Sequence, residues 1–166
     1  MIKTDIAIIG GGAAGLFAAA KIAGKKETLA IILFEKMPRC GRKIGLTGKG
    51  RCNLTNTREW PDFSTHIHPN ANFFKSSFFA CSNNDVMSFF EGIGLKLSIE
   101  RGNRVYPASM RATDVVDALA GYIKREGIKI INNCTIKEII PAVDSSYTAQ
   151  TEEKKETIRP EKNISG

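Results

Sequence analysis

The hydrophobic positions in the first part of the chain follow the pattern of a strand, a helix and a second strand. Residues 4–9 form a short, β-branched, mostly apolar run that ends in glycines. Residues 13–23 are rich in alanine and favour a helix, and residues 29–34 are again continuously apolar. Because the connection is short and helical, the two strands are expected to be parallel, with a right-handed crossover.

The rest of the chain gives weaker patterns. Residues 37–57 are glycine-rich, basic and without periodicity, which predicts a loop. Ser82, or an asparagine after it, and Thr113 are expected to cap the helices that follow them. The other predicted elements are helices over 73–80, 85–93 and 114–125, a hairpin over 96–106, and strands over 128–131 and 135–140.

The glycines after the first strand form the pattern G-x-G-x-x-G. Gly10 permits the tight turn, Gly12 lets a pyrophosphate approach the backbone beside Ala14, and Gly15 lets the helix pack closely on the strand. The start of the helix then offers free N–H groups to phosphates. Glu35 ends the second strand, where its carboxylate can accept hydrogen bonds from a ribose diol. Strand, helix and acidic residue in this order predict a dinucleotide site.

Glu35 also narrows the choice of dinucleotide. A carboxylate at this position repels a 2′-phosphate, so NADP is disfavoured there. The carboxylate does not distinguish FAD from NAD.

A second constellation lies between residues 35 and 56. It comprises Glu35-Lys36, Gly41-Arg42-Lys43 and the run from Thr47 to Asn53. Together with Gly102-Asn103-Arg104-Val105-Tyr106-Pro107 and the run 112–119, it resembles the flavoprotein family called HI0933-like, which includes aminoacetone oxidase-like and bile-acid dehydro-reductase proteins. The resemblance runs over most of residues 1–141.

The resemblance implies FAD as the cofactor, with NAD(P)H possible as electron donor. It implies an α/β, Rossmann-like FAD-binding domain of the glutathione-reductase type, with a parallel sheet that is incomplete at its C-terminal end. It also suggests that the main chain at Ile136 borders the adenine. The candidate cofactor contacts are Gly10, Gly12, Ala14, Gly15, Glu35, Lys36, Arg42, Lys43, Thr47, Gly48, Gly50, Arg51, Asn53 and Ile136.

The same resemblance predicts the domain organisation of the chain. Residues 1–141 are expected to form the N-terminal part of the FAD-binding domain, with 57–108 as a helical and hairpin insertion. Residues 142–166 are expected to be a polar tail, an edge hairpin without its partner, or the start of a truncated β-meander. Family members continue well beyond this length, so their returning strand and substrate domain are expected to be missing here.

The net charge and the cysteines narrow the kinds of partner and metal site that the sequence predicts. The formal net charge of the 166 residues is +7, and basic residues gather between Arg39 and Arg58 with no acidic residue among them, which favours anionic partners such as cofactor phosphates. Nucleic acid is a less favoured partner because no aromatic residues interleave with these charges. The four cysteines show no metal-ligand spacing, so no metal site is expected. No segment has the features of an export signal or membrane span, so a cytoplasmic protein is expected.

The sequence therefore predicts the FAD-binding portion of a flavin-dependent oxidoreductase, with its substrate and catalytic residues unknown. Two alternatives remain. One is a catalytically inactive truncated fragment, and the other is a flavin-dependent tRNA-modifying protein, since such proteins also begin with a glycine-rich FAD loop.

Overall fold

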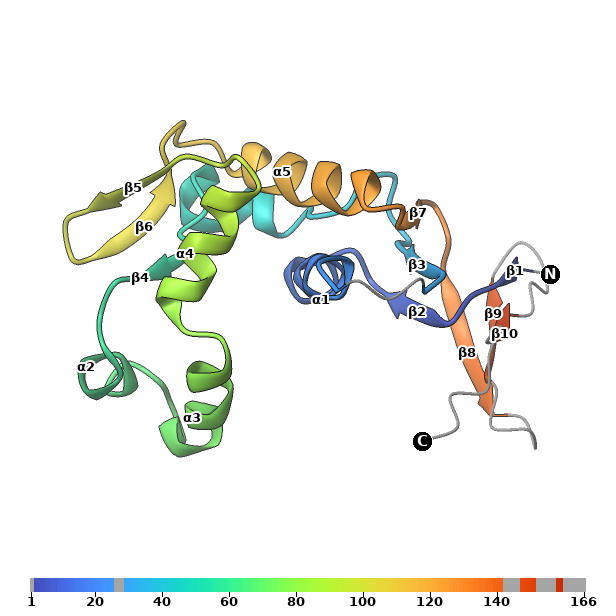
Figure 1. Ribbon diagram of the computed structural model, residues 1–166, viewed down its shortest axis with the longest axis horizontal. Helices are drawn as coiled ribbons and strands as arrows, with labels where there is room; N and C mark the ends of the chain where they lie inside the picture. Colours follow the sequence, from blue (N-terminus) through green and yellow to red (C-terminus); the bar gives the residue numbers. More distant parts are fainter. Residues whose placement is uncertain (1, 26–28, 142–146, 152–157, 160–166) are drawn as a thin grey trace. The chain divides into compact units, whose positions relative to one another are not determined.

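The computed structural model describes residues 2–25, 29–141, 147–151 and 158–159 (Figure 1). The chain divides into two compact units, each described here by itself. The first unit comprises residues 1–43 and 119–166, and the second comprises residues 44–118. Helix α5 (Ala112–Arg125) contributes residues to both. The second unit is wider than the expected insertion over 57–108, and the domain division proposed from the sequence stays a prediction.

The first unit is built on a parallel sheet of β2 (Ile6–Ile9), β3 (Ile31–Phe34) and β7 (Lys129–Ile131), in the order β2-β3-β7. Helix α1 (Ala13–Ala23) connects the first two strands. This confirms the predicted α/β fold with a parallel sheet. The ladder begins at Ile6 and not at Thr4, because the Thr4 hydroxyl and the Asp5 carboxylate hydrogen-bond the backbone of Ala30 instead.

Two further strand pairs complete this unit. Strand β8 (Ile136–Pro141) pairs antiparallel with β9 (Tyr147–Thr151), and β1 (Ile2–Lys3) pairs parallel with β10 (Ile158–Arg159). The expected hairpin therefore has a partner strand, β8, and Ala149 of β9 is buried against Ile32 and Phe34 of the sheet. Residues 142–146, 152–157 and 160–166 of the expected tail lie outside the described residues.

The second unit combines short helices with a three-stranded antiparallel sheet. The predicted hairpin is confirmed, since β5 and β6 pair antiparallel. Ser82 caps α4 through a reciprocal pair of hydrogen bonds with Asp85. The elements are η1 (Ile44–Gly50), β4 (Thr55–Asn56), α2 (Trp60–Ser64), α3 (Ala71–Ala80), α4 (Asn83–Gly92), β5 (Leu97–Glu100) and β6 (Arg104–Pro107).

Two local predictions were wrong. The stretch 37–57 is not all loop, because it contains the helical turns of η1 and the strand β4, which pairs with β6. Thr113 does not cap its helix, because α5 already begins at Ala112. The start of α5 is held by Asp114, whose carboxylate pairs with Arg111 at 3.0 Å. A hydrogen bond from Ser109 and this pairing lower the pKa of Asp114.

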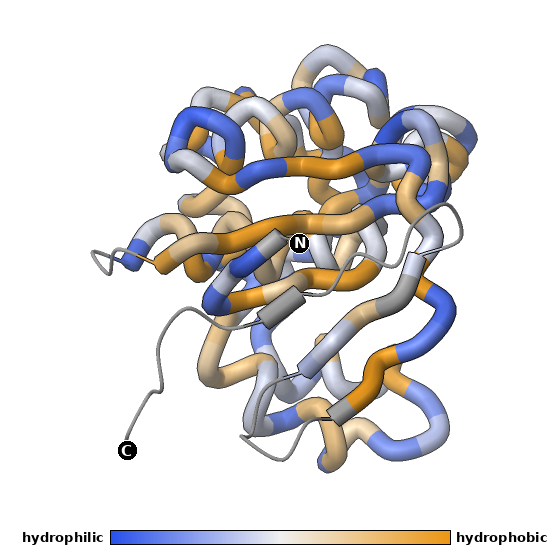
Figure 2. The backbone as a smooth tube through the Cα atoms, turned by 90° about the vertical axis from the view of Figure 1, so that its right-hand side faces the viewer, coloured by the Kyte–Doolittle hydropathy of each residue, from blue (hydrophilic) through white to orange (hydrophobic). Residues whose placement is uncertain are grey.

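The core of the first unit lies where the helices pack on the sheet. Leu33 and Phe34 of β3 are fully enclosed, as are Leu16 of α1 and Ile123 of α5. In Figure 2 the extended segments at the centre of the view are mostly hydrophobic. A strand buried on both faces needs such a continuous apolar run, which is why residues 29–34 show no alternation.

Substitution of Leu33 by alanine tests this core. The side chain is 0% exposed in the central strand, so the variant should lose about 2–5 kcal/mol of unfolding free energy through lost transfer energy and the cavity left behind. Urea denaturation followed by circular dichroism measures the loss. Leu46→Ala is the matched control, since Leu46 is 76% exposed and should cost about 0.5 kcal/mol or less. Equal costs would contradict this description of the core.

Candidate functional site

The glycine loop lies between β2 and α1, as the sequence predicts. Gly10 has a φ of +100°, a conformation that favours glycine. A Cβ on Gly15 would lie 1.9 Å from the Gly10 carbonyl oxygen, so only glycine permits this close approach of helix and strand. In contrast, a Cβ on Gly10 or Gly12 would meet no described atom within 4 Å. The space in front of the loop is therefore open.

The start of α1 supplies hydrogen-bond donors to that space. Gly12 occupies the N-cap position without a side chain to cap the helix, and Ala13 and Ala14 are exposed. The first N–H groups of an α-helix have no partner within the helix. Since the first turn contains no acidic side chain either, these donors and the positive end of the helix dipole suit a phosphate group.

Glu35 is buried at the end of β3 and connects three parts of the site. One carboxylate oxygen accepts the Gly11 N–H at 2.7 Å, and the other accepts the Met37 N–H at 2.8 Å. Glu35 lies at the end of its strand as predicted, whereas the sequence pattern does not indicate these two bonds. A carboxylate can accept about four hydrogen bonds, so two backbone donors leave capacity for a ribose diol.

Sequence reasoning missed the contributions of Gly11 and Cys40. A Cβ on Gly11 would lie 2.4 Å from the Cys40 sulfur and 3.1 Å from a Glu35 oxygen, so this glycine is also required by packing. Burial, and then the negative charge of Glu35, raise the pKa of the Cys40 thiol, while Lys124 lowers it. The thiol therefore acts as a neutral packing group behind the glycine loop.

The segment Gly41-Arg42-Lys43 is fastened to the first glycine loop. The Gly41 N–H donates to the Gly11 carbonyl at 2.7 Å, and Gly41 has a φ of +71°. Arg42 and Lys43 are exposed, as is Lys36. Backbone contact thus anchors this segment while leaving its charged groups in solvent, where they can reach an anion.

In the second unit, the run from Thr47 to Asn53 is a strained glycine-rich turn. Gly48, Lys49, Gly50 and Cys52 all have φ values between +56° and +84°. The Cys52 N–H donates to the Thr47 carbonyl at 3.1 Å, which closes the turn. Positions of this kind concentrate at functional sites, because surrounding structure must hold them.

Arg51 is held by groups of its own unit. Its guanidinium pairs with Glu100 at 3.2 Å and lies 4.6 Å above the centre of the Tyr106 ring. These contacts fix the turn against the β5–β6 sheet. Arg51 therefore has a structural role that the sequence did not indicate, whereas its cofactor contact stays a prediction.

Asn53 is exposed beside this turn. Its amide faces the carbonyl oxygens of Thr55 and Val105, which accept only, so the amide nitrogen points to them at 3.0 and 3.3 Å. These contacts orient the Asn53 side chain toward β4 and β6.

Ile136 begins β8 and is half-buried against the core around Phe34. The register of the β8–β9 ladder shifts between Ile136 and Glu138. Such a shift interrupts regular pairing at the residue that the resemblance places beside the adenine.

In the part of the chain that the structure describes, no group of three metal-ligating side chains comes together. Within the same residues no helix is long and apolar enough to span a bilayer.

The fold and the first unit's glycine loop define a Rossmann-like domain. A family model described as the HI0933-like protein Rossmann domain matches residues 4–164, and the chain belongs to this family. The resemblance seen in the sequence is thereby confirmed. FAD is the cofactor that the family and the fold indicate.

Two curated relatives are similar to this chain. A 3-dehydro-bile acid delta(4,6)-reductase of Clostridium scindens is 32% identical over 134 residues, which are 81% of this chain and 32% of that protein. A ribosomal RNA dihydrouridine synthase of Haemophilus influenzae is 30% identical over 132 residues, 80% of this chain and 32% of that protein. The chain thus spans about a third of the length of these relatives.

Solved structures share the fold at low identity. A 3-ketosteroid-delta4-(5alpha)-dehydrogenase of Rhodococcus jostii matches with a TM-score of 0.69 and 10% identity, over 96% of this chain and 44% of that one. An L-alpha-glycerophosphate oxidase of Mycoplasma pneumoniae with FAD bound matches with a TM-score of 0.52 and 14% identity, over 98% of this chain and 53% of that one.

Substitution of Gly15 by alanine tests the glycine loop. The added methyl group would collide with the Gly10 carbonyl, so the loop must move and both FAD affinity and stability should fall, the latter by about 1–3 kcal/mol. FAD titration and thermal unfolding measure the two effects. Gly121→Ala on α5 is the control, because its Cβ would make an ordinary 3.5 Å contact and should be neutral or stabilising. An unaffected Gly15 variant would contradict the role assigned to this residue.

Substitution of Glu35 by glutamine should lower the pKa of Cys40. Removing the charge relieves one of the two causes that raise it, so thiolate forms at lower pH. The pH midpoint of Cys40 alkylation by iodoacetamide, followed by mass spectrometry, should move down, whereas altered access would change only the plateau rate. Cys52 serves as internal control, because burial and Thr47 account for its shift. An unchanged Cys40 midpoint would show that Glu35 does not act on this thiol.

Proposed function

We propose that this chain is the FAD-binding portion of a flavin-dependent oxidoreductase that reduces a carbon–carbon double bond conjugated to a carbonyl group. The observation that carries the first half is the Glu35 carboxylate joined to Gly11 and Met37 beside an open, uncapped helix start. This arrangement suits an adenosine ribose and a pyrophosphate at neighbouring positions.

Each candidate residue receives a role from the geometry within its own unit. In the first unit, Gly10, Gly12, Ala14 and Gly15 are proposed to face the pyrophosphate, and Glu35 the ribose. The exposed Lys36, Arg42 and Lys43 are proposed to neutralise phosphate charge, and the backbone at Ile136 to border the adenine.

In the second unit, the run from Thr47 to Asn53 is proposed to approach the flavin ring. Gly48 and Gly50 allow backbone to approach a planar ring closely, with Thr47 and Arg51 beside them. The Asn53 side chain is proposed to hydrogen-bond the flavin, because an amide carries both donors and an acceptor.

The reaction class follows from the two relatives' names. Delta(4,6) reduction of a 3-dehydro-bile acid and formation of dihydrouridine each add one hydride and one proton to a double bond conjugated with a carbonyl. When bound, FAD would supply the hydride, with a nicotinamide as the source of electrons. The sequence shows no general acid–base pair, so the proton is assigned to the substrate, water or the flavin.

An RNA uracil is the second candidate substrate. It is favoured by the dihydrouridine synthase relative and by the basic residues between Arg39 and Arg58. A steep fall in RNA affinity with rising salt would support it. The first candidate class, a small conjugated ketone, predicts no such dependence.

Flavin titration of the purified chain tests cofactor binding. FAD should bind and gain a flavin absorbance spectrum in the protein fraction, whereas FMN should bind about 100-fold more weakly, because the residues of the first unit recognise the ADP half. Glu35→Gln should weaken FAD binding about tenfold or more, and Glu91→Gln on the exposed face of α4 should not.

The FAD-loaded protein then tests the reaction class. After anaerobic reduction with dithionite, 2-cyclohexenone should restore the oxidised flavin spectrum, and the saturated cyclohexanone should not. Absence of flavin uptake would contradict the proposed cofactor, and equal reaction with both ketones would contradict the proposed chemistry.

A further inference from the structure

The second unit contains a pocket that shares one residue, Asn53, with the proposed cofactor contacts. Its volume is about 930 Å³, and its lining comes from the segment 53–58, from α2, α3 and α4, and from the β5–β6 turn. All these residues belong to one compact unit, so the pocket is formed within that unit alone. Its size is in the range of small-molecule sites.

One end of the pocket is positively charged. Arg101 lies in the turn between β5 and β6, Arg104 is the first residue of β6, and the Arg104 Nε donates to the Arg101 carbonyl at 3.2 Å. Glu100 lies opposite Arg104 in the ladder, but its carboxylate pairs with Arg51. Among the described residues neither turn arginine therefore has an acidic partner. Arg58, also in the lining, differs because it pairs with Asp62.

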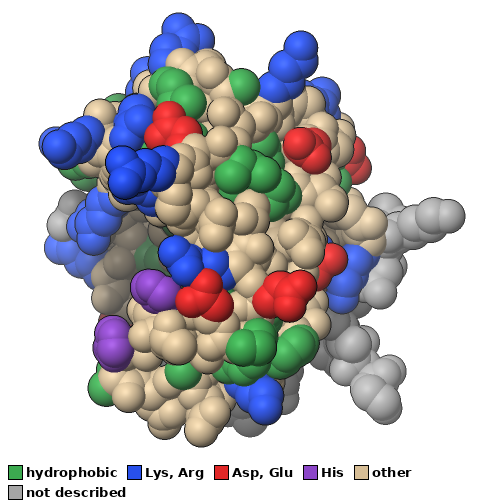
Figure 3. Space-filling model, turned by 90° about the vertical axis from the view of Figure 1, so that its left-hand side faces the viewer, with side chains coloured by type: hydrophobic (Ala, Val, Ile, Leu, Met, Phe, Trp, Pro, Cys, Tyr) green, Lys and Arg blue, Asp and Glu red, His purple; other side chains and the backbone are tan. Residues whose placement is uncertain are grey.

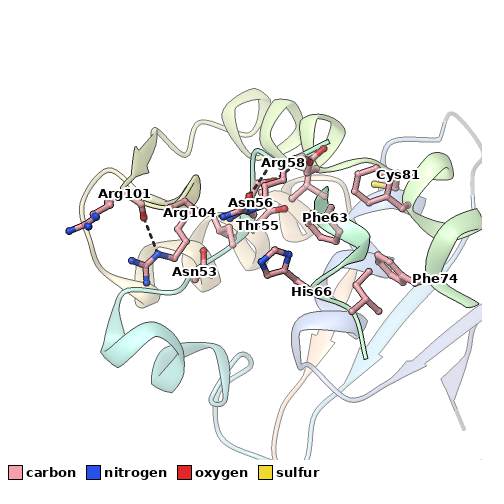
Figure 4. A pocket seen from close by; sticks show the side chains of 16 residues that line it. Asn53, Thr55, Asn56, Arg58, Phe63, His66, Phe74, Cys81, Arg101 and Arg104 are labelled. Atoms are coloured by element: carbon pink, nitrogen blue, oxygen red, sulfur yellow. Dashed lines mark hydrogen bonds between the residues drawn. The ribbon is translucent and has the colours of Figure 1, made fainter. Parts of the chain in front are cut away.

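The other end is aromatic. Figure 4 places Arg101 and Arg104 at one end, Phe63 and Phe74 toward the other, and His66 between them. Phe74 is 41% exposed although it is a large apolar side chain. The face in Figure 3 also shows basic side chains gathered, with the histidines beside a hollow. An apolar surface next to unpaired cations suits a ligand with both properties.

The wall between these ends is fixed by buried hydrogen bonds. The Asn83 side chain is buried and donates to the carbonyls of Asn56 and Arg58, each at 2.6 Å. The Phe63 and Phe78 rings pack with centroids 4.9 Å apart. A pocket with a fixed wall loses little conformational freedom when a ligand binds.

We propose that this pocket binds a small organic anion with a flat apolar body, such as a carboxylate or sulfonate on fused rings. The anionic group contacts Arg101 and Arg104, and the rings lie against Phe63 and Phe74. Asn53 also lines the pocket. Because the proposed function assigns Asn53 to the flavin, the pocket is a substrate subsite next to the flavin, and this assignment rests on the proposed function. Anion binding itself does not require FAD.

Two related fluorescent probes test the pocket. 8-Anilinonaphthalene-1-sulfonate carries a charge, and N-phenyl-1-naphthylamine has the same aromatic body without it. Trp60 is the only tryptophan, and its ring lies 5.1 Å from that of Phe78, which lines the pocket. Energy transfer from Trp60 therefore reports probe bound in this neighbourhood, and the variants below locate it in the pocket. The titration is made without FAD.

The double variant R101A/R104A should raise the Kd for the sulfonate about tenfold or more and leave the Kd for the neutral probe within about twofold. The control K75A/K96A removes two charges of the same unit outside the lining and should change neither. Phe74→Ser should weaken both probes. Circular dichroism confirms that each variant is folded.

Three results would overturn the proposal. The first is that R101A/R104A and K75A/K96A raise the Kd for the sulfonate equally. The second is that R101A/R104A raises the Kd for both probes equally. The third is that an oligouridylate displaces the sulfonate at a lower concentration than 2-naphthoate does. The last would assign the pocket to RNA. Failure to bind flavin with the probe pattern intact would overturn only the cofactor proposal, and loss of the pattern with flavin bound would overturn only this one.

Discussion

The buried carboxylate of Glu35 is the contact on which the first unit's site depends. It accepts one N–H from the glycine loop and one from the chain that leaves β3. Hydrogen bonds to a charged group contribute on the order of 1.5–3 kcal/mol each, and leaving a carboxylate unpaired in this position would cost more than either. The loop, the end of the strand and the following turn therefore hold one another in place, and Gly41 extends the arrangement through its bond to the Gly11 carbonyl.

Close packing behind the glycine loop also stabilises its conformation. Cys40 fills the space behind Gly11, and Gly15 touches the carbonyl of Gly10. Side chains are excluded at both points, which leaves the helix start bare and its N–H groups available. The openness of the site is thus a consequence of tight packing directly behind it. Burial of a neutral thiol beside Glu35 is tolerated because the raised pKa keeps Cys40 uncharged.

In the second unit, backbone conformation and an ion pair position the proposed flavin contacts. Four residues between Gly48 and Cys52 have left-handed backbone conformations, which the surrounding structure must hold. Arg51 contributes by contacting Glu100 and Tyr106. Because Arg51 uses Glu100, the turn arginines beyond it are left without an acidic partner. Arg51 therefore has a structural role, whereas Arg101 and Arg104 line the pocket.

The sequence by itself determined the βαβ start, the hairpin, the cap at Ser82 and the family, because these depend on local periodicity, glycine spacing and residue type. It placed Glu35 at the end of its strand, but the bonds to Gly11 and Met37 come from residues brought together by folding. The start of α5 at Ala112 lies one residue before the expected cap at Thr113, and the turns of η1 were also not predicted, since the positive φ values there are held by surrounding structure. Only the tertiary structure assembled the pocket, because its aromatic end comes from α2 and α3 and its cationic end from the β5–β6 hairpin, with α4 between them in the chain. Sequence patterns of short range carry no record of which segments meet.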